Sequence, residues 1–153
     1  MSPFTSYDNP ALACQVKIFP DTGVVTSPQF PRRYPNNVDE TQTIQVEQGK
    51  ILVLDFTYFA VKSSADCEDD HIKVTDGDGS ILMDNSCGYS SYKKHEAEYF
   101  KPPKIITMSN IVHLYFKTDT DGTRTGWSVT WRAVRPGGFL NNHPRMLQTK
   151  FRC

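Results

Sequence analysis

The sequence lacks a hydrophobic run long enough to cross a membrane as a helix. Its longest aliphatic run, Ile51–Leu54, stops at Asp55, far short of the roughly 20 apolar residues that a membrane-spanning helix needs. An excess of charge of one sign is also missing, because 17 lysines and arginines balance 17 aspartates and glutamates. Nothing in this composition attracts nucleic acid. We therefore predict neither a membrane span nor a nucleic-acid partner.

Signatures of catalysis are missing as well. The sequence contains no Gly-x-Ser-x-Gly element, no His-Glu-x-x-His pair and no glycine-rich phosphate-binding loop, which are motifs of several large enzyme classes. Its carboxylates cluster between Asp66 and Asp70, but groups on one short loop do not flank a cleft as a hydrolase pair must. We predict that the protein is not an enzyme.

Cysteines are few, even in number and widely spaced. They are Cys14, Cys67, Cys87 and Cys153. None forms a Cys-x-x-Cys pair, and none has zinc-finger spacing with a histidine. This pattern indicates disulfides and an oxidising, extracellular compartment, with free buried thiols as the alternative. The first residues, Met1 to Ser6, lack the basic and hydrophobic regions of a signal peptide, so we expect either a removed signal or a piece of a longer chain.

Alternating apolar residues predict a chain built from β-strands. In Gly126–Arg132, for example, Trp127, Val129 and Trp131 share one face, a period of two that is typical of half-buried strands. Further strands are predicted at 43–47, 50–59, 72–74 and 111–117. The turn signal Asp76–Gly79 ends one of them. Several short strands separated by turns predict an antiparallel sandwich or barrel.

The middle of the chain differs in composition from its two ends. Hydrophobic residues make up 38% of the 153 residues, which is enough for one domain with one core. We predict a flexible lead over residues 1–13, a β-sandwich domain over 14–134, and a tail or linker over 135–153. The tail opens with Pro136-Gly137-Gly138 and contains several basic residues, so a basic contact segment is the alternative.

Ordered motifs along the chain resemble the CUB domain family. The opening signature is Gly23–Pro31, followed by Tyr34–Asn37. The later pieces follow in the family's order: Phe56–Phe59, Cys67–Asp70, Thr75–Gly77, Cys87-Gly88, Ser109-Asn110, Phe116–Asp119 and Gly126-Trp127. The resemblance covers about residues 14–134. It implies an all-β, jelly-roll-like sandwich of two antiparallel sheets that acts as an extracellular binding module.

The resemblance also implies how the cysteines pair. The family's second disulfide maps onto Cys67 and Cys87. Its first disulfide maps only in part, because Cys14 fits one half while Glu40 stands at the partner position. We expect a Cys14–Cys153 link, with a bond to a second chain or two unpaired thiols as the alternatives.

Many CUB domains bind calcium, and the resemblance implies a degenerate version of that site. Two ligand aspartates map onto Asp70 and Asp119, and a supporting tyrosine maps onto Tyr34. The ligand glutamate is replaced by Lys62. An ammonium group supplies no oxygen and repels the ion, so we expect Lys62 to neutralise the two aspartates in place of calcium.

Two further acidic residues keep calcium open as an alternative. Asp121 and Gly122 stand where the family usually has serine and asparagine. If calcium binds, Asp121 or Asp66 would be the substitute ligand. We otherwise predict no cofactor.

Aromatic and basic residues gather in the segment Tyr89–Phe100. Tyrosines beside lysines are common at interfaces, although they also occur as ordinary loop packing. The candidate binding residues are Tyr89, Tyr92, Lys93, Lys94 and Tyr99. We predict a secreted recognition module that binds a protein or glycan, for example in cell adhesion, with a homo-oligomer as a further arrangement. The alternative is a regulatory or substrate-targeting domain of a larger secreted protease or receptor.

Overall fold

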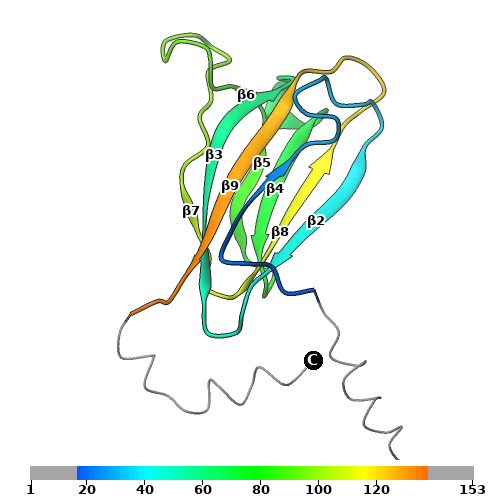
Figure 1. The fold of residues 1–153 in the computed structure, drawn as a ribbon. Helices are drawn as coiled ribbons and strands as arrows, with labels where there is room; N and C mark the ends of the chain where they lie inside the picture. The colour runs from blue at the N-terminus through cyan, green and yellow to red at the C-terminus, as the bar shows by residue number, and fades with distance from the viewer. Residues whose placement is uncertain (1–16, 138–153) are drawn as a thin grey trace, which may run out of the picture.

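The computed structural model describes residues 17–137, which form two antiparallel β-sheets packed face to face (Figure 1). One sheet has the order β1-β9-β3-β6, with β7 also paired to β3, and the other has the order β2-β8-β4-β5. The strands are β1 (Thr22–Thr26), β2 (Asp39–Gln45), β3 (Ile51–Val61), β4 (His71–Asp76), β5 (Ile81–Ser86), β6 (Gly88–Tyr89), β7 (Ile105–Ile106), β8 (Ile111–Lys117) and β9 (Gly126–Val134). The predicted all-β sandwich is confirmed.

The core lies between the two sheets and is made by the alternating side chains. On β9, Trp127 and Val129 are fully buried. The Trp127 ring lies 5.7 Å from that of Phe116 on β8 and 6.4 Å from that of Phe56 on β3. Trp127 therefore contacts both layers, and its edge-to-face geometry with Phe116 is the one that aromatic pairs prefer.

The strand predictions were right for β3, β4, β8 and β9, and less complete elsewhere. β2 begins at Asp39, four residues before the predicted start at Thr43. The sequence did not indicate these first residues, because they are polar on both faces and show no hydrophobic alternation. Strands β1, β5, β6 and β7 were not predicted. Residues 1–13 and most of the tail lie outside the described residues, so the proposed domain boundaries remain predictions.

Four loops meet at one end of the sandwich, which we call the loop end. They are residues 27–38, 62–70, 90–100 and 118–125. In Figure 1 this is the upper end, whereas the first and last described residues lie at the lower end. The described residues include no helix with the length and apolar character needed to span a membrane.

Candidate functional site at the loop end

An ion pair joins the end of β3 to the loop between β8 and β9. Lys62 follows β3 directly, and its Nζ donates to both carboxylate oxygens of Asp119, at 3.0 and 3.1 Å, and to the main-chain carbonyl of Asp121. Burial disfavours the charged form of Lys62, but the hydrogen bond to Asp119 and the charge of Asp70 outweigh it and raise the pKa of the ammonium. The hydrogen bond from Lys62 holds the pKa of Asp119 below its usual value.

A buried carboxylate lies next to this ion pair. Asp70, just before β4, is fully buried and accepts hydrogen bonds from the Tyr34 hydroxyl at 2.8 Å and from the Asp119 amide at 2.9 Å. Burial raises the pKa of Asp70, while these two hydrogen bonds act in the opposite direction. Each carboxylate oxygen of Asp70 thus has a donor, as a buried charge requires.

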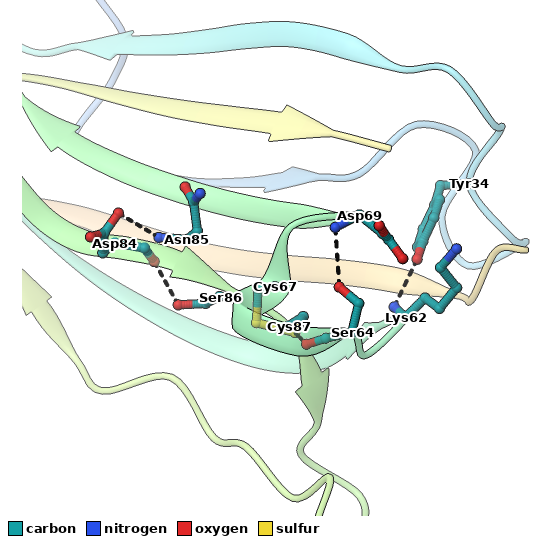
Figure 2. The surroundings of a disulfide bond; sticks show 9 residues. All are labelled: Tyr34, Lys62, Ser64, Cys67, Asp69, Asp84, Asn85, Ser86 and Cys87. Atoms are coloured by element: carbon teal, nitrogen blue, oxygen red, sulfur yellow. Dashed lines mark hydrogen bonds between the residues drawn. A yellow bond between two sulfur atoms is a disulfide. The ribbon is translucent and has the colours of Figure 1, made fainter. Parts of the chain in front are cut away.

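Tyr34 connects the Lys62–Asp119 ion pair with the buried carboxylate of Asp70. Its hydroxyl accepts a hydrogen bond from the Lys62 amide at 2.9 Å while it donates to Asp70, and Figure 2 shows its ring pointing toward Lys62. Burial raises the pKa of the Tyr34 phenol far above its ordinary value, so the group remains a donor. The cluster of Tyr34, Lys62, Asp70 and Asp119 ties together three loops of the loop end.

A disulfide between Cys67 and Cys87 lies beside this cluster (Figure 2). It links η1 (Ala65–Cys67), a short helical turn, to the residue after β5. A cleft of about 420 Å³ is lined by the two cysteines together with Ser63, Ser64, Gly88 and residues 97–100. Cys14 and Cys153 lie outside the described residues, so their expected link remains a prediction.

Residues 90–98 form a projecting loop that stands away from the sandwich (Figure 1). Main-chain hydrogen bonds close its base, from Tyr89 to Glu98 at 2.9 Å and from Phe100 to Tyr89 at 3.1 Å. Ser91 to Glu98 are exposed, whereas Tyr99 is half-buried. Of the candidate binding residues, Tyr92, Lys93 and Lys94 therefore face solvent.

Tyr89 has a different position from the other candidate binding residues. Its side chain is only 5% exposed, and its ring stacks on that of Tyr92 with centroids 4.6 Å apart. Arg124, from the loop between β8 and β9, donates to the Tyr89 hydroxyl at 2.9 Å. Tyr89 thus lies at the base of the projecting loop and packs against Tyr92. The sequence carried no signal for Arg124, which is a single arginine in a polar loop.

The residues that are present do not fit a calcium ion. Both oxygens of Asp119 accept hydrogen bonds from Lys62, and both oxygens of Asp70 also have donors. Asp66 is exposed on η1, and Asp121 turns its main-chain carbonyl toward Lys62. Within residues 17–137 there is no group of three or more acidic, histidine or cysteine side chains arranged to hold a metal. Calcium needs six to eight oxygen ligands, which this arrangement does not offer.

The described residues thus form a small antiparallel β-sandwich of two sheets, with a disulfide at its loop end. The family model described as "CUB domain" matches residues 14–131, and the chain belongs to the CUB domain family. Human cubilin is 33% identical over 130 residues, which cover 83% of this chain and 3% of cubilin. Mannan-binding lectin serine protease 1 of the rat is 30% identical over 116 residues, which cover 74% of this chain and 15% of the protease. The chain thus spans a small part of these curated relatives.

Solved structures give the same fold. The crystal structure of the MASP-1 CUB2 domain bound to Ca²⁺ is 27% identical, covers 75% of this chain and 95% of that domain, and superposes with a TM-score of 0.63. The extracellular region of zebrafish Gpr126/Adgrg6 is 23% identical over 80% of this chain and 15% of that structure, with a TM-score of 0.65. This second likeness concerns the fold alone.

Proposed function

We propose that this domain is a non-catalytic recognition module of a secreted or extracellular protein, and that its partner binds at the loop end. Membership of the CUB domain family supports the proposal, as does the similarity to cubilin and to mannan-binding lectin serine protease 1. The observation that carries it is the projecting loop, which holds Tyr92, Lys93 and Lys94 in solvent at the end opposite the described chain ends.

The projecting loop is suited to bind a protein surface. Tyr92 is 40% exposed and stacks on the buried ring of Tyr89, so it offers apolar area at a small cost in side-chain entropy. Lys93 and Lys94 are exposed, and neither forms a salt bridge within residues 17–137. A partner that presents carboxylates around an apolar patch would complement this loop.

The second candidate function is a regulatory or substrate-targeting domain of a secreted protease. It is favoured by the similarity to rat mannan-binding lectin serine protease 1 and to zinc metalloproteinase nas-39 of Caenorhabditis elegans, which is 27% identical over 83% of this chain and 13% of that protein. Both candidates use the loop end for binding, so one experiment addresses their common part.

The test is capture of a partner from extracellular fluid by the immobilised protein, followed by mass spectrometry. We expect the combined variant Tyr92→Ala, Lys93→Ala and Lys94→Ala to reduce capture of the main partner at least about tenfold, because interface tyrosines contribute strongly to affinity. The control variant combines Lys104→Ala and Arg132→Ala, which removes two exposed charges outside the loop end.

The outcomes of this experiment test the binding surface and identify the class of partner. Equal capture by the loop variant and the unchanged protein would refute the proposed binding surface. Loss of capture after enzymatic deglycosylation of the fluid would assign binding to a glycan. Recovery of the same chain as the main partner would indicate a homo-oligomer.

A further inference from the structure

We infer that the Lys62 ammonium takes the place of a divalent cation, so that the loop end of this domain is ordered without calcium. The MASP-1 CUB2 domain has been solved bound to Ca²⁺, whereas in this domain an ammonium lies among the acidic groups of the loop end.

The hydrogen bonds of the ammonium are complete. A lysine Nζ has three hydrogens to donate, and here its partners are the two carboxylate oxygens of Asp119 and the carbonyl oxygen of Asp121. The Lys62 side chain is 16% exposed and that of Asp119 is 32% exposed, so the two charges are paired at the rim of the loop end, where they are partly shielded from solvent. This arrangement resembles the oxygen shell of a bound cation, with a group of the chain at its centre.

The charges also balance as they would around an ion. In the calcium site that the resemblance implies, two aspartates and one glutamate around a divalent cation leave one unit of negative charge. Two carboxylates around one ammonium leave the same net charge. Exchanging a ligand glutamate for Lys62 while losing the ion therefore preserves the net charge of the cluster. Asp70 and Asp119 consequently need no further cation.

The loop between β8 and β9 fits closely around the lysine. Gly122 has a φ of +84°, a backbone conformation that favours glycine. A Cβ at this position would lie 3.1 Å from the Lys62 Cδ, which is closer than an ordinary van der Waals contact. The backbone at Gly122 thus covers the aliphatic part of Lys62, and a larger residue would displace it.

The experiment compares the thermal unfolding of three 153-residue chains with calcium and with a chelator. We expect the midpoint of the unchanged protein to differ by less than about 1 °C between about 10 mM calcium and excess EDTA. Lys62→Glu restores an oxygen ligand beside Asp70 and Asp119, so its midpoint should rise by about 5 °C or more with calcium. Isothermal titration with calcium alone should detect binding only to this variant.

Lys62→Met is the matched control, because it removes the charge without supplying an oxygen. We expect it to be less stable than the unchanged protein and to show no response to calcium. Stabilisation of the unchanged protein by calcium would overturn the inference, and this result requires no variant to fold. A Lys62→Glu chain that calcium neither binds nor stabilises, whether folded or not, would overturn it as well.

Discussion

Tyr34 is a residue whose one hydroxyl group satisfies two buried partners. It donates to the fully buried Asp70 and accepts from the Lys62 amide. We predict that Tyr34→Phe lowers the free energy of unfolding by about 1–3 kcal/mol, because a buried acceptor and a main-chain donor lose their partner while the ring remains. Urea denaturation followed by tryptophan fluorescence measures this loss.

Tyr92→Phe serves as the control for this prediction. Its ring is exposed on the projecting loop, so removing its hydroxyl should change stability by less than about 0.5 kcal/mol. Equal losses for the two variants would show that the Tyr34 hydroxyl has no special role.

Single residues of the loop end were predictable to different degrees. Lys62 and Asp119 are 57 positions apart, and only the resemblance to a family with a ligand pattern placed them together. No such pattern exists for Arg124 and Tyr89, because a contact between a loop arginine and a tyrosine hydroxyl depends on how two loops are folded. For the same reason, the sequence did not distinguish the buried Tyr89 from the exposed Tyr92.

At the scale of elements, the Cys67–Cys87 disulfide holds η1 against the end of β5. The bond spans 20 residues. We predict that the double variant Cys67→Ala and Cys87→Ala lowers stability by about 3 kcal/mol, since the cross-link restricts the unfolded chain. Guanidinium denaturation measures the change, with Ser63→Ala as a control in the same segment. An unchanged midpoint in the double variant would mean that the strands hold this region without help.

The sequence predicted some strands better than others, and this difference has a physical reason. β8 and β9 each have a partner on both sides and a buried face. Buried and less buried residues alternate along β8, and in β9 the apolar residues Trp127, Val129 and Trp131 alternate with polar ones. β1 and β5 lie at sheet edges, and the pairing of β5 with β4 shifts register twice. An edge strand with an irregular register need not alternate, and its sequence then resembles a loop.

At the scale of the whole molecule, Trp127 connects the two sheets. It is fully buried on β9 and contacts Phe56 in its own sheet and Phe116 in the other. We predict that Trp127→Ala lowers the free energy of unfolding by about 3–5 kcal/mol, because it leaves a cavity between the layers. Chemical denaturation measures this effect.

Ile106→Ala is the matched control, since Ile106 is 56% exposed on β7. This variant should lower the free energy of unfolding by no more than about 0.5–1 kcal/mol. A small effect of Trp127→Ala would mean that the remaining side chains close the space between the sheets.

The ammonium of Lys62 belongs to the polypeptide, so its presence at the loop end does not depend on any concentration outside the molecule. A bound ion exchanges with its surroundings, so its occupancy depends on the concentration of that ion there. Here the positive charge travels with the chain. We therefore expect the geometry of the Lys62 cluster to be the same in surroundings with and without divalent cations.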